Sequence, residues 1–166
     1  MAIPQTVRAS KAVAHAEHYT GEVPAAQLRR LAASTDHANG RITADWRAGR
    51  DAAGHPELFG RIGGSIALVC QHCLGAFDWT VDINVQLRLV DSDAEEARVL
   101  HECDPYRVHG DALPLREMTE DEVLLALPLM PRCETCENNA HTEPAGESSD
   151  ESEGPKPLAA LKQFKF

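Results

Sequence analysis

Long apolar runs and aromatic side chains are both scarce in this chain of 166 residues. No stretch reaches the roughly 18 apolar residues that a membrane-spanning helix needs, so the sequence predicts no such helix. The N-terminal segment also lacks the apolar stretch of a secretory signal, and we expect the protein to stay in the cytoplasm. The apolar fraction of 43% and the charged fraction of 25% are typical of a globular domain and exclude a fibrous chain.

Catalytic motifs are missing as well. The sequence contains no glycine-rich phosphate loop, no Gly-x-Ser-x-Gly elbow and no His-Glu-x-x-His zinc motif. The acidic run Glu120–Glu122 could contribute carboxylates, but it is placed where a predicted helix opens, and the helix dipole favours negative charge there. We therefore interpret this run as structural, and we expect a protein that is not an enzyme.

Charge is unevenly distributed along the chain, whose formal net charge is −10. The first 69 residues hold eight Arg and Lys against six Asp and Glu, whereas the remainder holds eight against twenty. Such a protein does not bind nucleic acid through a broad basic face, so any contact with a nucleic acid or a protein partner is expected to be local. The sequence predicts four arginines for this contact, although each could be an ordinary solvated charge: Arg29, Arg30, Arg41 and Arg47.

Apolar periodicity predicts an α+β fold. Apolar and polar residues alternate over 41–48 and 57–69, and the clearest alternation runs from Ala76 to Leu89, so we expect antiparallel strands there. Apolar residues at helical spacing predict helices over about 24–34 and from Asp111 to Leu127. We expect an antiparallel, partly barrel-like sheet with a Cys-x-x-Cys knuckle between two strands and flanking helices.

Composition divides the chain into segments. We expect a single α+β domain over 1–136, in which residues 1–20 form an N-terminal arm and residues 91–110 a mobile excursion. Residues 137–154 are rich in Glu, Ser and Gly and poor in apolar residues, which predicts a disordered acidic linker. Residues 155–166 have leucines and a phenylalanine at helical spacing, which predicts an amphipathic C-terminal tail.

Three aromatic residues on predicted strands, Trp46, Phe77 and Trp79, have two interpretations. Aromatic side chains on a strand can stack on unpaired bases, as they do in proteins that bind single-stranded nucleic acid. On the apolar side of a strand they more often fill the core. We expect these three side chains in the core.

Five cysteines supply the strongest site motif in the sequence. Four of them form two Cys-x-x-Cys pairs, Cys70 with Cys73 and Cys133 with Cys136, and Cys103 stands alone. An odd number of cysteines in close pairs suits reduced thiols or a metal site better than a secreted disulfide framework. Two such pairs supply the four thiolates of a tetrahedral structural zinc site, so we predict that these four residues bind zinc together.

This prediction leaves alternatives open. The pairs are separated by 59 residues, more than in usual zinc ribbons, so they meet only if the fold brings them together. His72, His101 or Cys103 could serve as substitute ligands. Redox catalysis by Cys70 and Cys73 is a further alternative, but a thioredoxin-like pair precedes a helix, whereas a strand is predicted after Cys73.

Four segments appear in an order that is typical of one known family. They are Tyr19–Gly21 before the first helix, the segment Leu68–Leu74 with the first cysteine pair, the acidic helix segment Glu120–Pro128, and Pro157–Lys162. Together they resemble the YceD family, bacterial and plastid proteins implicated in the accumulation of large-subunit ribosomal RNA. The resemblance extends over nearly the whole chain, and relatives differ in how many cysteines follow the second helix.

The resemblance implies a non-catalytic accessory factor in ribosomal RNA metabolism, which promotes accumulation or processing of 23S ribosomal RNA and assembly of the large subunit. The implied partners are precursor ribosomal RNA, a ribosomal protein or a large-subunit precursor, with no membrane and no small-molecule substrate. The alternative is an enzyme, either a nuclease acting on ribosomal RNA or a Cys-x-x-Cys thiol oxidoreductase. A nuclease would need carboxylates grouped around a divalent ion, whereas the acidic residues lie mostly in predicted loops and the linker.

Overall fold

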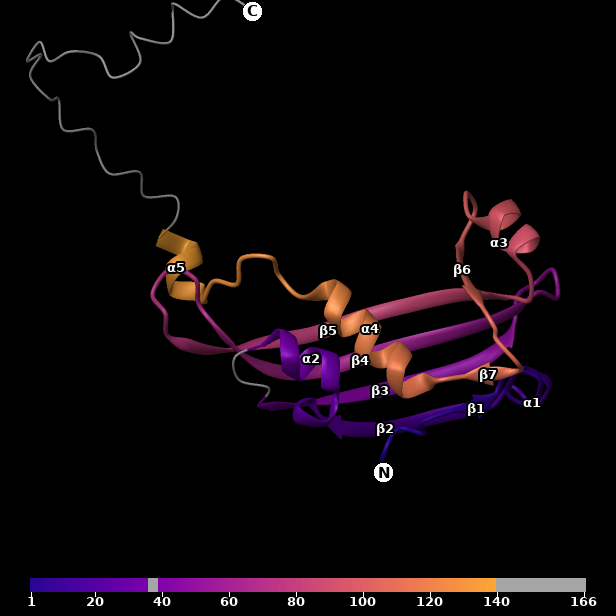
Figure 1. Cartoon of the computed structure of the whole chain (residues 1–166), viewed down its shortest axis with the longest axis horizontal. Helices are drawn as coiled ribbons and strands as arrows, with labels where there is room; N and C mark the ends of the chain where they lie inside the picture. Colours follow the sequence, from indigo (N-terminus) through magenta and orange to yellow (C-terminus); the bar gives the residue numbers. More distant parts are fainter. Residues whose placement is uncertain (36–38, 140–166) are drawn as a thin grey trace, which may run out of the picture.

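A five-stranded sheet is the centre of the computed structural model, which describes residues 1–35 and 39–139 (Figure 1). Its strands are β2 (His18–Pro24), β3 (Gly40–Arg50), β4 (Pro56–Val69), β5 (Ala76–Val90) and β6 (Asp104–Arg107). They lie in sequence order, and all neighbours are antiparallel except β5 and β6, which are parallel. Two further strands, β1 (Val7–Arg8) and β7 (Ala112–Leu113), form a separate antiparallel pair.

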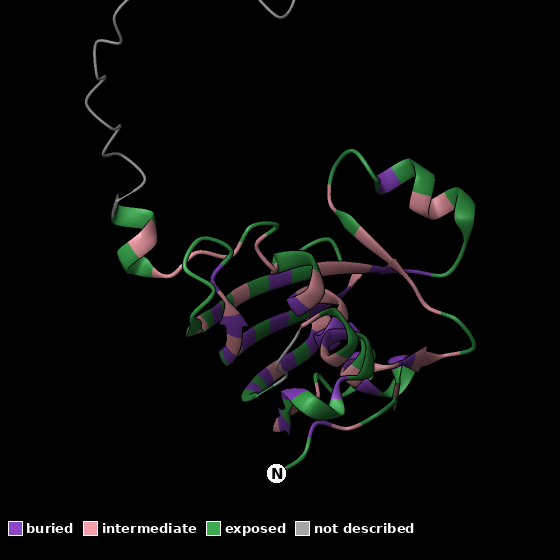
Figure 2. Cartoon of the chain, turned by 60° about the vertical axis from the view of Figure 1, so that its left-hand side comes forward, coloured by how far each residue is buried: buried purple, intermediate pink, exposed green. Residues whose placement is uncertain are grey.

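Two of the helices lie over one face of the large sheet (Figure 1). In chain order the helical elements are α1 (Ala9–Ala14), the 3-10 turn η1 (Ala25–Gln27), α2 (Arg29–Ser34), α3 (Asp93–Val99), α4 (Leu115–Ala126) and α5 (Glu134–Asn139). α2 and α4 lie over the strands, while α3 and α5 lie at opposite ends of the molecule (Figure 1). Successive side chains of a strand point to opposite faces, and buried and exposed residues accordingly alternate along the strands (Figure 2).

The core lies between α4 and the covered face of the sheet. Trp46 in β3 is fully buried, and its indole Nε1 donates a hydrogen bond of 3.0 Å to Thr119 Oγ1 in α4. Gly60, the partner of Trp46 on β4, leaves room for the indole ring, because a Cβ there would lie 2.4 Å from Trp46 Cζ3. The prediction of Trp46 as a core residue is confirmed, and Phe77 and Trp79 pack, partly buried, against the same core.

The prediction of an α+β fold with a mostly antiparallel sheet is confirmed, but the sheet is not closed. Closing a barrel would require the outer strands β2 and β6 to pair. β6 has four residues and pairs only with residues 87–90 at one end of β5, so it is too short to complete a ring of strands. The described sheet is therefore open, and its partial curling toward a barrel stays a prediction.

Two segments expected to be irregular are folded. Residues 1–20 are not an extended arm, because Ala12 and Val13 on α1 bury their side chains in the core and residue 18 already begins β2. Residues 91–110 are not irregular, because they contain α3, which ends with the buried Val99, and β6. Both segments contribute contacts that are distant in sequence, which local patterns do not reveal.

The C-terminal part differs from the predicted boundary. α5 includes residues 137–139, which the prediction assigned to the acidic linker. The remainder of the predicted linker, 140–154, and the predicted tail, 155–166, lie outside the described residues. Within the described part of the chain, the longest helices are too short and too polar to cross a membrane.

Candidate metal centre and exposed sheet face

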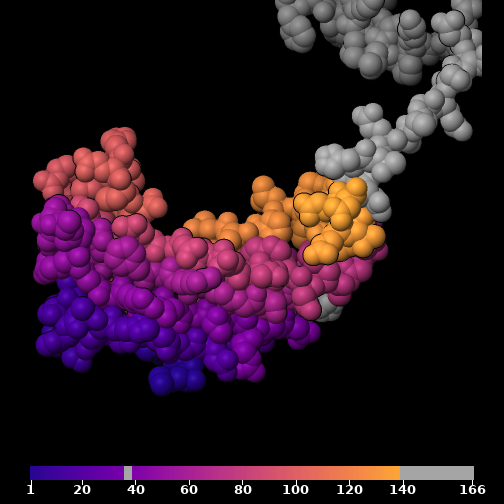
Figure 3. All heavy atoms as spheres, turned by 180° about the vertical axis from the view of Figure 1, so that it is seen from behind, coloured from indigo at the N-terminus to yellow at the C-terminus, as the bar shows by residue number. Residues whose placement is uncertain are grey.

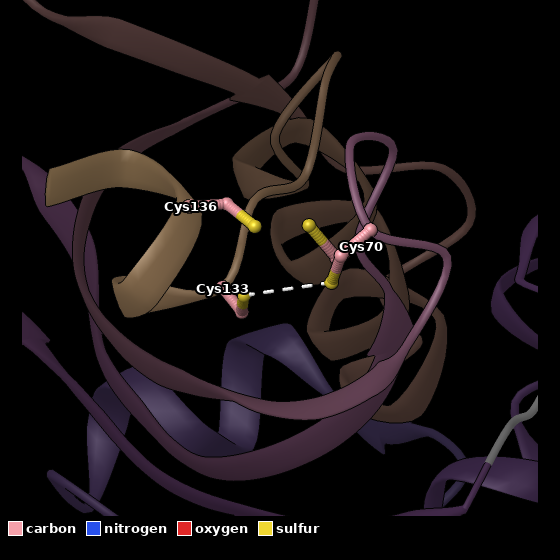
Figure 4. A group of neighbouring side chains, drawn as sticks. Cys70, Cys133 and Cys136 are labelled. Atoms are coloured by element: carbon pink, nitrogen blue, oxygen red, sulfur yellow. Dashed lines mark hydrogen bonds between the residues drawn. The ribbon is translucent and has the colours of Figure 1, made fainter. Parts of the chain in front are cut away.

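Four cysteines from two distant parts of the chain meet beside the loop that connects β4 to β5. Cys70 and Cys73 lie in this loop, Cys133 precedes α5 and Cys136 lies within it (Figure 4). Their four Sγ atoms lie within 4.8 Å of one another, and the Cys73 and Cys133 Sγ atoms are 3.8 Å apart. The structure therefore brings together the two pairs that the sequence predicted as ligands.

Backbone hydrogen bonds fix the first pair in a tight loop. The Cys70 N–H donates to the Gly75 carbonyl and the Leu74 N–H donates to the Cys70 carbonyl, both at 2.9 Å. Leu74 adopts a positive φ of 60°, which turns the chain back toward β5. The Gln71 N–H donates to the Pro131 carbonyl at 2.8 Å, and this bond ties the loop to the segment that carries the second pair.

The Cys73–Cys133 sulfur distance matches that expected in a tetrahedral metal site, and all four sulfur atoms lie within 4.8 Å of one another. A zinc ion at about 2.3 Å from each of four thiolates requires neighbouring sulfur atoms about 3.8 Å apart, the distance between the Cys73 and Cys133 Sγ atoms. A disulfide would need about 2.05 Å, and all four cysteines are free. Four soft thiolate donors in this arrangement select zinc or an iron–sulfur centre over magnesium or calcium.

The thiols of the cluster differ in acidity. Hydrogen bonds from the backbone N–H groups of Cys73 and Cys133 lower the pKa of Cys70 to about 6. A hydrogen bond with the Cys133 side chain, together with burial, raises the pKa of Cys136 to about 12. A bound divalent cation favours the thiolate form of all four groups.

The substitute ligands considered from the sequence do not join this cluster. His72 and His101 are exposed, and Cys103 donates a hydrogen bond to the Val99 carbonyl at 3.6 Å. Among residues 1–35 and 39–139, the four cysteines are the one group of three or more potential metal ligands that lie close together. The two Cys-x-x-Cys pairs are thus sufficient to complete the ligand set.

The acidic run Glu120–Glu122 has a different position from the one expected. It lies in the middle of α4, which begins at Leu115, and Glu120 is buried against α2. Its Oε1 accepts hydrogen bonds from the backbone N–H groups of Arg30, at 2.6 Å, and Leu31, at 3.1 Å. α2 has no side-chain cap of its own, so Glu120 supplies an N-terminal cap from a different helix. The run therefore does not begin α4 as predicted, and Glu120 instead stabilises the start of α2.

The four arginines predicted as contacts lie on two surfaces. Arg29 and Arg30 belong to α2, on the helix-covered side, whereas Arg41 and Arg47 point away from the helices on β3. Carboxylates pair with three of them: Arg30 with Glu120 and Asp121, Arg41 with Glu22, and Arg47 with Asp45. These four side chains do not form one basic patch.

Sequence reasoning missed a site on the uncovered face of the sheet. An open hollow of about 600 Å³ lies there, over β3, β4 and β5. Its polar and aromatic lining consists of Asp45, Arg47, Phe59, Arg61, Asn84 and Gln86. The alternation along β4 could have indicated this surface, because it places the aromatic Phe59 on the polar side of a strand whose inward residues are apolar.

Comparison with protein families matches residues 58–165 to the family described as "Large ribosomal RNA subunit accumulation protein YceD". The matched residues cover most of the chain and include all four clustered cysteines. No solved structure shows significant similarity to the chain.

Proposed function

This chain belongs to the YceD family, and from that membership we propose that it is a non-catalytic accessory factor in ribosomal RNA metabolism. It promotes accumulation or processing of 23S ribosomal RNA and assembly of the large subunit in the cytoplasm, by binding RNA or a ribosomal protein. The observation that carries this proposal is the family match over residues 58–165. The net charge of −10 favours a small local contact over a broad basic one.

A binding role is favoured over a nuclease by the distribution of possible metal ligands. A metal-dependent nuclease groups carboxylates around its ions, whereas the potential ligand cluster of the described residues consists of four cysteines. Redox catalysis by Cys70 and Cys73 is disfavoured because these two cysteines lead into strand β5 and not into a helix. Both comparisons support a factor that acts by contact.

Cys70, Cys73, Cys133 and Cys136 form, in this proposal, a structural zinc site. Four protein ligands leave no open coordination position, which is the arrangement of structural and not of catalytic zinc. The zinc would supply a crosslink between the β4–β5 loop and α5. This crosslink supplements the backbone hydrogen bond from Gln71 to Pro131.

Arg41 and Arg47 are proposed as contacts for RNA or a protein partner because they share the uncovered sheet face. Their side chains are well exposed, at 60% and 66%. Arg29 and Arg30 lie on the helix-covered side, and their role as contacts stays a prediction.

Deleting the gene and measuring ribosomal RNA tests the proposed function. We expect a lower ratio of mature 23S to 16S ribosomal RNA, restored when the full chain is expressed again. An unchanged ratio and unchanged precursor levels would overturn the proposal. Incubating the purified protein with precursor RNA and magnesium tests the non-catalytic part, because specific cleavage would identify an enzyme.

A further inference from the structure

The sheet has one face without helices over its central strands. Seen from behind, β3, β4 and β5 form the middle of the molecular surface (Figure 3). Phe59 in β4 lies on this face with 40% of its surface exposed. In the described residues it is the one aromatic side chain among the exposed large hydrophobic residues. An exposed aromatic ring on an otherwise polar sheet face is available for stacking.

Strand register sets the neighbours of Phe59. Arg47 in β3 and Gln86 in β5 are its direct partners on either side. In the adjacent row, Arg61 in β4 lies between Asp45 and Asn84. Paired residues on one face of an antiparallel sheet have Cβ atoms about 5 Å apart. The side chains of Arg47, Phe59, Arg61, Asn84 and Gln86, here named the Phe59 platform, therefore form one continuous surface.

The platform combines three kinds of chemistry. The Phe59 ring offers a flat apolar face, the Asn84 and Gln86 amides each offer donors and an acceptor, and Arg47 and Arg61 offer cations. Arg47 uses Nε to bind Asp45 at 3.0 Å, and Arg61 approaches Asp82 at 3.7 Å. Both side chains remain largely exposed, at 66% and 72%.

Charge limits the kind of ligand that fits. The two platform arginines are matched by two carboxylates, because Arg47 pairs with Asp45 and Arg61 approaches Asp82, so this area is close to neutral on an acidic protein. Asp78 lies on the same face of β5, farther along the strand. A ligand with a few phosphates and accessible base faces matches this surface better than a long duplex, because a flat sheet does not enter a helical groove.

We infer that the Phe59 platform binds single-stranded RNA, and this inference rests on the proposed function because it names the contact through which the factor acts. One base stacks on Phe59, the Asn84 and Gln86 amides contact base edges, and Arg47 and Arg61 contact phosphates. Stacking on an aromatic side chain tolerates any base, so the platform binds with little sequence preference.

Fluorescence anisotropy with a labelled single-stranded RNA of about 12 nucleotides tests the inference on the full chain. Phe59→Ala removes the stacking ring and is expected to weaken binding about tenfold, whereas Phe59→Tyr keeps the ring and retains binding. Two phosphate contacts predict that log K changes with log salt with a slope of about −1.4. Arg61→Gln removes one contact and is expected to reduce the slope by about 0.7.

Two substitutions on other surfaces provide matched controls. Leu125→Ala truncates an exposed apolar residue of α4, and Arg98→Gln removes an exposed cation from α3. Both are expected to bind RNA as the unchanged chain does. Thermal unfolding of every variant separates a lost contact from a lost fold, because all substituted side chains are exposed and their unfolding temperatures should stay close together.

Three outcomes would overturn the inference. The folded protein could fail to bind RNA at low salt, or Phe59→Ala could bind RNA as tightly as the unchanged chain. In the third outcome, Phe59→Ala loses binding to a basic ribosomal protein but keeps RNA binding. The last outcome would assign the platform to a protein partner. If gene deletion lowers 23S ribosomal RNA and Phe59→Ala restores it fully, the proposed function stands and the platform fails. If deletion has no effect while the platform binds RNA, the proposed function fails separately.

Discussion

Replacing the buried Glu120 with alanine should destabilise the protein more than replacing an exposed residue of α4. Glu120 is 7% exposed, and its carboxylate accepts hydrogen bonds from the backbone N–H groups of Arg30 and Leu31 at the start of α2. Arg30 also reaches this carboxylate with its guanidinium group at 3.3 Å. Glu120→Ala removes all of these contacts and leaves two N–H groups at a helix terminus without their acceptor.

The size of the effect follows from these contacts. Loss of an N-terminal cap costs about 1 kcal/mol in typical helices, and a hydrogen bond to a charged group contributes about 1.5–3 kcal/mol. Arg30 retains Asp121 as an ion-pair partner, so its charge is not left unpaired. We expect the free energy of unfolding to fall by about 3 kcal/mol, with a decrease in the midpoint of thermal unfolding of about 10 °C.

Urea denaturation followed by circular dichroism measures this change. Glu117→Ala is the matched control, because Glu117 lies on the same helix but is exposed, and we expect a change within about 0.5 kcal/mol. Glu120→Gln keeps one oxygen acceptor and should lie between the two. If Glu120→Ala and Glu117→Ala have the same stability, Glu120 does not stabilise α2 and the reasoning is refuted.

Three further predictions concern the sheet, its loops and the cysteine cluster. Gly60→Ala should destabilise the protein by about 1–3 kcal/mol in urea denaturation, because the new methyl group meets the buried Trp46 ring; unchanged stability would contradict this packing. Hydrogen bonds from the His55 ring, followed by backbone N–H groups, lower the pKa of Asp51 to about 2. The Asp51 carboxylate therefore stabilises the fold fully above its unfolded pKa of about 3.9, and this contribution is lost as the pH falls toward 2. Stability measured across this range should depend less on pH in Asp51→Asn, and an identical acid profile would contradict the assignment. Cys73→Ser should lower the bound zinc per chain and speed proteolysis near α5, whereas Cys103→Ser should do neither; equal zinc in both variants would contradict a shared site.

The main strands could be read from the sequence because their signal is local. The period of two over Ala76–Leu89 corresponds to β5, and the turn residues before Pro56 correspond to the β3–β4 connection. β6 could not be read in this way, because four residues carry almost no periodicity and their pairing with β5 depends on contacts across the fold. The same holds for α1, whose small residues indicate a helix only when the core around them is known.

The cysteine site was predictable as a ligand set but not as a geometry. Spacing within each pair indicated thiolate ligands, whereas the meeting of Cys73 with Cys133 depends on the chain path after α4. For Phe59, alternation placed the ring on the polar side of β4, but only the packing of the helices decides which sheet face stays uncovered. For Glu120 the local pattern was misleading. The acidic run predicted the start of its own helix, whereas the Glu120 side chain caps the start of α2.

Metal analysis of the purified full chain, combined with thiol titration before and after denaturation, tests the cysteine centre most directly. The account predicts close to one zinc per chain, with four thiols protected in the native protein and five reactive after denaturation in the presence of a chelator, since Cys103 lies outside the cluster. A metal-free protein with all five thiols freely reactive in its native fold would contradict the shared site formed by Cys70, Cys73, Cys133 and Cys136.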